Sequence, residues 1–104
     1  MIECVQGYAG CLPAPGGYVK AARDLCTRYN ALFVCDEIQT GFGRTGYLMS
    51  YQKEDIQPDL VMLGKAITGG MYSMGMVLGS RQTIGQLQPG ELVPAYAVRI
   101  YTSG

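Results

Sequence analysis

The sequence contains no histidine and no tryptophan. Without histidine, the usual zinc sites, the Ser-His and Cys-His catalytic pairs and histidine general bases are excluded. Acid-base chemistry in this chain must therefore use a lysine, a carboxylate or a tyrosine. An excess of charge is also missing, because eight basic residues balance eight acidic ones and no basic run occurs. The chain thus offers no electrostatic footprint for nucleic acid or an anionic membrane.

Long apolar runs are absent as well. No stretch approaches the roughly 20 residues that a bilayer crossing requires, and the first residues lack the basic-then-apolar pattern of a signal peptide. We therefore expect a cytoplasmic location, which residues upstream of this sequence would be able to change. A chain of 104 residues with 48% apolar composition is expected to form one domain with a small core.

Four cysteines occur in the chain: Cys4, Cys11, Cys26 and Cys35. None of them forms a C-x-x-C motif, and each has apolar neighbours or falls on an expected helix face. We interpret them as buried free thiols of a reducing compartment. No metal site is expected.

The apolar pattern predicts alternating strands and helices. Apolar residues recur with helical spacing from Tyr18 to Tyr29, with Lys20, Arg23 and Asp24 on the opposite face, and Asn30 is a plausible stop. The remaining elements are extended segments at 2–5, 31–35, 59–63 and 74–78 and a short helix at 81–87. The run at 31–35 is continuous, as in a parallel strand covered on both faces. This order predicts an α/β fold with an open, mainly parallel sheet of three to four strands and flanking helices.

Two polar residues stand at the ends of consecutive predicted strands. Asp36 follows the run 31–35, and Lys65 follows the run 59–63. In open α/β sheets, ligands bind beyond the carboxyl ends of the strands. If the two strands are sheet neighbours, a carboxylate and an amine meet at one edge. Taken singly, each residue also has an ordinary explanation, as a turn-forming aspartate and a solvated lysine.

Three motifs carry a resemblance to a known family: Asp36-Glu37-Ile38-Gln39-Thr40-Gly41, the Gly-Arg-Thr-Gly run at 43–46, and the segment 58–70 around Leu63-Gly64-Lys65-Ala66. In order and spacing they resemble the cofactor region of class III pyridoxal phosphate-dependent aminotransferases, and most nearly the ornithine aminotransferase branch. The resemblance implies that residues 1–91 are part of the cofactor-binding large domain of a fold-type-I enzyme. Residues 92–104 do not match the pattern and are expected to be a divergent tail.

The resemblance also implies roles for three side chains. Lys65 would bond the aldehyde of pyridoxal 5'-phosphate and later move a proton. Asp36 would pair with the pyridinium nitrogen, and Gln39 would donate a hydrogen bond to the ring oxygen of the cofactor. Arg44 is interpreted as a residue that orders its loop. The implied reaction is transfer of an amino group from an amino acid such as ornithine to a 2-oxo acid.

Two departures from the family pattern alter these expectations. The opening Glu3-Cys4-Val5-Gln6-Gly7-Tyr8 has Cys4 where the family has proline and Tyr8 where it has a second glutamate. Tyr8 would bind substrate through its phenol or, as is more common, pack. Ala95 replaces the threonine that holds the phosphate of the partner subunit in the dimeric family. We therefore expect a truncated chain whose independent activity is doubtful.

Two alternatives stay open. The first is a non-catalytic remnant that associates with a full-length relative through exposed strand edges, or that has no biochemical role. The second is an unrelated small α/β module in which Asp36 and Lys65 are ordinary surface residues. Cofactor binding distinguishes both alternatives from an aminotransferase.

Overall fold

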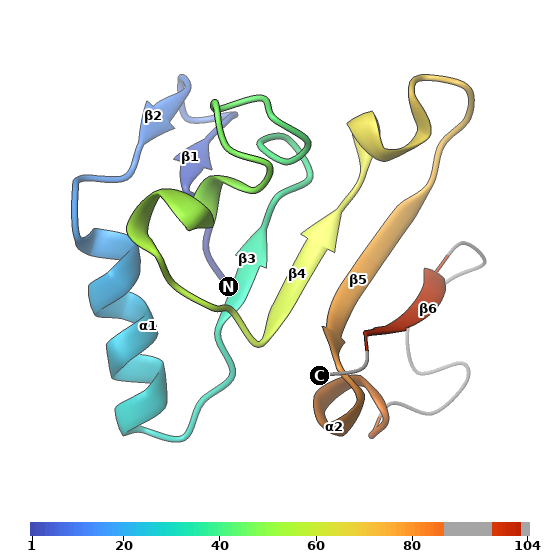
Figure 1. Ribbon diagram of the computed structural model, residues 1–104. Coiled ribbons are helices and arrows are strands. Elements are labelled where there is room, and N and C mark those ends of the chain that lie inside the picture. The colour runs from blue at the N-terminus through green and yellow to red at the C-terminus, as the bar shows by residue number, and fades with distance from the viewer. Residues whose placement is uncertain (87–96, 103–104) are drawn as a thin grey trace.

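The computed structural model describes residues 1–86 and 97–102. Figure 1 shows a small two-stranded sheet beside a four-stranded one, with the helix α1 packed at one side. The elements in chain order are β1 (Val5–Gln6), β2 (Leu12–Pro13), α1 (Tyr18–Arg28), β3 (Val34–Asp36), the 3-10 helix η1 (Ser50–Glu54), β4 (Leu60–Leu63), the 3-10 helix η2 (Lys65–Thr68), β5 (Gly75–Ser80), α2 (Arg81–Ile84) and β6 (Ala97–Thr102).

The main sheet has the strand order β3-β4-β5-β6. β3 and β4 run parallel, as do β5 and β6, which agrees with the predicted mainly parallel sheet. The exception is the antiparallel pairing of β4 with β5. Only the segment 64–74, with the single turn η2, joins these two strands. A parallel crossover needs a dozen or more residues and usually a helix, so this short connection reverses the chain direction.

α1 confirms the predicted helix and ends at Arg28, just before Asn30 with its left-handed φ of 52°. Its N-terminus lacks a side-chain cap of its own. Glu54 of η1 supplies the acceptors instead: Oε1 accepts from the backbone N–H of Gly17 at 3.0 Å and Oε2 from that of Lys20 at 2.8 Å. A carboxylate is favourable there because free N–H groups and the helix dipole point at it.

The buried face of α1 differs from the predicted one. Val19 is the buried residue of the helix, with Ala22 and Cys26 packed against the same core. Tyr18 and Leu25, which the spacing assigned to the core face, are 56% and 52% exposed. Arg23, assigned to the solvent face, is half-buried and bonded to Asp59. The buried face is therefore shifted from the predicted one toward Val19 and Arg23, while Ala22 and Cys26 remain on it as predicted.

One face of the sheet carries the core. Cys35, Val61 and Leu63 are buried in two adjoining clusters, the first under α1 with Val19 and Phe33, the second with Met49. The alternate residues of β3 and β4 are half-buried. The run at 31–35 was predicted to be covered on both faces. In the described part of the chain, only one face is fully covered. No described helix has the length and apolar character needed to cross a bilayer.

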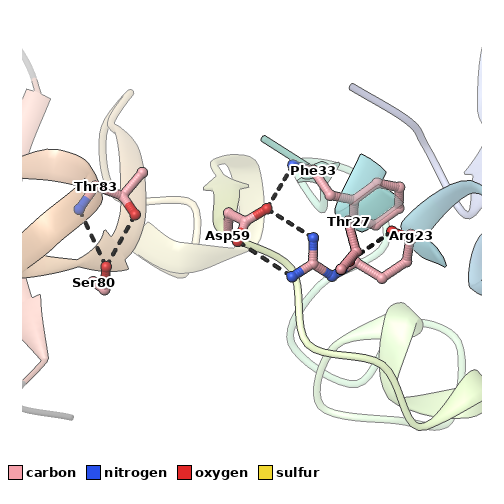
Figure 2. A network of polar contacts seen from close by, with 6 residues as sticks. All are labelled: Arg23, Thr27, Phe33, Asp59, Ser80 and Thr83. Atoms are coloured by element: carbon pink, nitrogen blue, oxygen red, sulfur yellow. Dashed lines mark hydrogen bonds and ion pairs between the residues drawn. The ribbon is translucent and has the colours of Figure 1, made fainter. Parts of the chain in front are cut away.

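An ion pair anchors α1 to the amino ends of the parallel strands. Figure 2 shows the guanidinium of Arg23 facing the carboxylate of Asp59, with Nη1–Oδ2 at 2.9 Å and Nη2–Oδ1 at 3.3 Å. Oδ2 also accepts from the backbone N–H of Phe33 at 2.7 Å. This two-pronged contact joins the helix, the approach to β3 and the start of β4, and thereby sets the register of the edge opposite the predicted site.

Candidate active site

The predicted site lies at the carboxyl ends of β3 and β4. The two strands are parallel neighbours, with Asp36 opposite Met62 in the register. Asp36 is the last residue of β3, and Lys65 comes two residues after the end of β4. The expectation that these strands adjoin is thus confirmed.

Asp36 is oriented by its own loop. Its backbone N–H donates to the carbonyl oxygen of Ile2 at 2.8 Å, and its Oδ1 accepts from the backbone N–H of Ile38 at 3.0 Å. The other carboxylate oxygen, Oδ2, has no hydrogen-bond donor among the described residues, and the side chain is half-buried. One oxygen is therefore held by the protein and one is left to accept a proton-bearing nitrogen.

Glu37, next to Asp36, is a buried carboxylate for which the sequence motifs indicate no role. It is 0% exposed and accepts hydrogen bonds from three donors: the hydroxyls of Thr40 and Ser50 and the backbone N–H of Tyr51. A buried charge is tolerated when donors surround it. This network fixes the turn after β3 and ties it to η1. The sequence feature that could have indicated this network is Thr40, a hydroxyl donor three residues after Glu37.

Gln39 lies against the N-terminal segment. A Cβ placed on Gly7 would meet the side-chain amide of Gln39 at 2.6–2.7 Å, so the absence of a side chain at Gly7 gives Gln39 its position. Gly7 donates its own backbone N–H to Glu3 Oε2 at 3.2 Å. The amide of Gln39 is thereby placed between the loop after β3 and the segment that follows β1.

Lys65 stands on a strained, exposed turn. Its φ is 47°, a left-handed value that a residue with a side chain adopts at a cost of about 1–3 kcal/mol. The preceding Gly64 is buried, and a Cβ there would meet Ile38 Cγ2 at 3.2 Å. This close approach brings the start of η2 against the loop that carries Asp36 and Gln39. Strain of this kind persists where the surrounding structure imposes it, and it concentrates at functional sites.

Tyr8 is the partner of Lys65. The Nζ atom of Lys65 lies 5.8 Å from the centroid of the Tyr8 ring, within the range of a cation–π contact. Tyr8 is 95% exposed, so the expectation that packing is its more common fate is wrong here. The dipeptide Gly7-Tyr8 therefore contacts Gln39 with its first residue and Lys65 with its second.

Arg44 does not order its loop as predicted. It is exposed and forms no hydrogen bond or ion pair among the described residues. Glu37 orders this part of the chain instead, through Thr40 and Ser50. Ala95, the other residue singled out for cofactor phosphate binding, lies outside the described residues, as does the predicted boundary between 91 and 92.

The donor set fits the ring of pyridoxal phosphate. A carboxylate oxygen without a donor suits a protonated ring nitrogen, a primary amine suits an aldehyde, and an amide suits a ring oxygen. Asp36, Lys65 and Gln39 supply these three groups from loops that meet at one edge of the sheet. Within residues 1–86 and 97–102, no group of three or more cysteine, aspartate or glutamate side chains is arranged to hold a metal ion.

Comparison with known proteins identifies the family of the chain. The model of the family Aminotransferase class-III matches residues 1–98. The chain is 47% identical over 91 residues to the mitochondrial ornithine aminotransferase of Drosophila melanogaster and 46% identical over 90 residues to the ornithine aminotransferase of Vigna aconitifolia. These alignments cover 88% and 86% of this chain but 21% of each relative, so the chain spans about a fifth of their length.

Solved structures give the same result. The ornithine aminotransferase of Plasmodium yoelii superposes with a TM-score of 0.84 at 40% identity, covering 89% of this chain and 25% of that one. The acetylornithine aminotransferase of Elizabethkingia anophelis gives a TM-score of 0.80 at 41% identity, covering 88% and 24%. The matched region is part of the α/β large domain of fold-type-I enzymes, which use pyridoxal phosphate. The chain therefore belongs to the class III aminotransferase family.

Proposed function

We propose that this chain provides the ring-binding and lysine-bearing part of a pyridoxal phosphate site in an ornithine aminotransferase-like protein. The reaction would transfer an amino group from an amino acid such as ornithine to a 2-oxo acid. The observation that carries the proposal is the placement of Asp36 and Lys65 after adjoining parallel strands, because the two side chains then flank one volume beyond the sheet edge.

In this proposal each side chain has a distinct task. Bound pyridoxal phosphate supplies a conjugated ring that accepts electrons from the substrate carbon. Asp36, with Oδ1 already held by Ile38, would use Oδ2 to hold the ring nitrogen in its protonated form. Lys65 would anchor the cofactor through its amine and, when that amine is free, would carry a proton at Nζ.

Gln39 and Tyr8 are the remaining side chains of the proposed site. Gln39 donates from Nε2 to the ring oxygen, from a position that depends on the missing side chain of Gly7. Tyr8 presents an aromatic face to Nζ of Lys65, where the family has a carboxylate. An aromatic ring stabilises the displaced ammonium of Lys65 without forming an ion pair with it. We propose that the ammonium of Lys65 stays in contact with the Tyr8 ring whenever Lys65 is not bonded to cofactor.

The test is covalent capture of the cofactor. Pyridoxal 5'-phosphate is added to the purified chain, the mixture is reduced with borohydride, and the labelled residue is identified by peptide mass spectrometry. We expect one label per chain, on Lys65, and its loss in Lys65→Ala. Lys53→Ala is the matched control, because Lys53 is also exposed but lies on η1. Equal labelling of Lys53 and Lys65 would contradict the proposal.

A second candidate function is association with a full-length relative. It is favoured by large apolar side chains that are exposed on the loops after β3 and β4: Phe42 at 41%, Leu48 at 61%, Met71 at 88% and Tyr72 at 64%. Exposed apolar groups of this kind mark interaction surfaces. Size-exclusion chromatography tests it: a larger species formed with an ornithine aminotransferase supports association, and a chain that stays monomeric in its presence opposes it.

Location and self-association are further proposals. We retain the cytoplasm as the predicted location, although the Drosophila melanogaster and Rattus norvegicus relatives are mitochondrial by name. Cell fractionation with an antibody to the chain distinguishes the two compartments. Pairing of two copies, as in the dimeric family, is tested by the concentration dependence of the sedimentation coefficient.

A further inference from the structure

A pair of thiols lies behind the predicted site, where the first residues of the chain run beside β3. Ile2 forms a parallel bridge with Cys35, secured by a 2.9 Å hydrogen bond from Ile2 N–H to the Val34 carbonyl. This pairing brings Cys4, two residues after Ile2, into the same buried cluster as Cys35. Cys4 is 9% exposed and Cys35 is fully buried.

The two thiols influence each other in opposite directions. A hydrogen bond from the Cys35 thiol lowers the pKa of Cys4, against the effect of burial, and the Ser50 hydroxyl adds to the lowering. The hydrogen bond to Cys4 and burial raise the pKa of Cys35. The two directions favour the thiolate at Cys4 over the thiolate at Cys35. A thiolate is the reactive form of cysteine toward oxidants.

Cys4 is also the accessible member of the pair. It lines a cavity of about 230 Å³ together with polar groups that include Ser50 and Lys53, whereas Cys35 does not line it. A cavity of this size, with the polar groups of Ser50 and Lys53 in its otherwise largely apolar wall, admits molecules as small as water or a peroxide. The positions of the two sulfurs therefore separate the reacting thiol from the resolving thiol.

We propose that Cys4 and Cys35 form a modification site that reacts with hydrogen peroxide or another small hydroperoxide and closes to a disulfide. The Cys4 thiolate attacks a peroxide oxygen: an S–O bond forms, the O–O bond breaks, and the departing hydroxide takes up a proton as water. The Cys35 sulfur then attacks the Cys4 sulfur: the S–S bond forms, the S–O bond breaks, and hydroxide leaves with the Cys35 proton as water. The two thiols together lose two electrons, and one hydrogen peroxide is reduced to two waters, or one organic hydroperoxide to an alcohol and a water.

The other two cysteines, Cys11 and Cys26, have different surroundings. Cys11 is exposed, which contradicts the interpretation of all four as buried, and its Sγ lies 3.9 Å from the Gly7 carbonyl oxygen. Cys26 is half-buried on α1 at the margin of the cluster and contributes to neither the pKa of Cys4 nor that of Cys35. Because Cys35 directly precedes Asp36, the disulfide would tie the start of the chain to the end of β3.

Peptide mass spectrometry of the reduced, folded chain treated with hydrogen peroxide tests the proposal. Cys11→Ser is introduced first, because trypsin leaves Cys4 and Cys11 together in peptide 1–20, whereas Cys26 and Cys35 fall in peptides 24–28 and 29–44. We expect an intact mass lower by about 2 Da, for the two hydrogens lost, and a link between peptides 1–20 and 29–44 that dithiothreitol reverses. A link to peptide 24–28, or oxidation without any link, would overturn the proposal.

Variants separate the two sulfurs. In Cys35→Ser, peroxide should leave Cys4 as a sulfenic acid that dimedone captures, and in Cys4→Ser the folded chain should show no peroxide-dependent change at Cys35. Cys26→Ser is the matched control and should form the link unchanged. Where a variant fails to fold, the peroxide-treated parent chain is denatured without reductant and then alkylated: Cys4 and Cys35 should resist N-ethylmaleimide together, and resistance of either one alone would refute the pair.

Discussion

Asp36 and Lys65 follow adjoining parallel strands, yet the chain supports them very differently. The aspartate side rests on Glu37, a fully buried carboxylate with three donors, and on the loop hydrogen bond from Ile38. The lysine side is an exposed 3-10 turn, and among the described residues the amine of Lys65 contacts the ring of Tyr8, 5.8 Å from its centroid. A buried charge must be held by fixed donors, whereas an exposed amine on a flexible stem is free to swing toward a ligand.

This contrast matches the tasks assigned to the two residues. A carboxylate that must hold one ring nitrogen gains from being fixed before the ligand arrives. An amine that is bonded to cofactor in one state and carries a proton in another needs freedom to move. The described part of the chain thus supplies rigidity on one side of the proposed site and mobility on the other.

The largest effect is expected at Glu37. Glu37→Ala should lower the free energy of unfolding by about 3 kcal/mol or more, because two buried hydroxyls and a backbone N–H lose their acceptor. Lys65→Ala should change it by less than about 0.5 kcal/mol, since the amine is exposed. Urea unfolding followed by circular dichroism measures both. Equal losses in the two variants would remove the contrast.

A smaller loss is expected at the opposite edge of the same strands. Asp59→Ala should cost about 1–3 kcal/mol, because the half-buried guanidinium of Arg23 and the N–H of Phe33 lose their acceptor. Asp24→Ala is the matched control on α1: its pair with Lys20 is 59% and 64% exposed, and should contribute under about 0.5 kcal/mol. The same urea unfolding measurement applies to both variants. A loss of unfolding free energy in Asp24→Ala as large as in Asp59→Ala would show that exposure does not determine how much these ion pairs stabilise the fold.

Alkaline pH should weaken the aspartate side through Tyr51. Burial raises the pKa of this phenol above its ordinary value of 10.0, with the nearby charge of Glu37 adding to the effect. The folded state therefore binds the proton more tightly, and the stability contribution present below pH 10 is lost as pH rises through the folded pKa. The slope is at most about 1.4 kcal/mol per pH unit for one proton. Tyr51→Phe should flatten this loss above pH 10, and an unchanged slope would exclude Tyr51.

The smallest effect is expected at Gly7, which contacts the amide of Gln39. Gly7→Ala should displace the Gln39 amide, which a Cβ would approach to 2.6–2.7 Å, and weaken pyridoxal phosphate binding about two- to ten-fold, as for one lost hydrogen bond. Gly16→Ala, where a Cβ meets nothing within 4 Å, should leave binding unchanged. Absorbance titration with the cofactor measures both variants. Equal affinities in Gly7→Ala and the parent chain would separate Gln39 from the site.

Short-range patterns allowed much of the fold to be predicted. The helix at 18–28, the strands near 31–36 and 59–63, and the parallel pairing of these two strands follow from apolar spacing and from the short crossover between them. The inward position of Arg23 on α1 was missed because its partner, Asp59, lies 36 residues away in sequence. The antiparallel direction of β5 was missed because apolar runs carry no direction.

The sequence by itself determined the family, the order of helices and strands, and the residue types available for chemistry, because these depend on local spacing and on motifs read in order. Tertiary structure alone decided which side chains are held in place and which are exposed. It set the donors that surround Glu37 and the close contact of Gln39 with Gly7. It also set the exposure of Tyr8 beside Lys65 and the burial of Cys4 and Cys35 in one cluster. Burial and proximity arise from contacts between segments distant in sequence, and no local pattern specifies them.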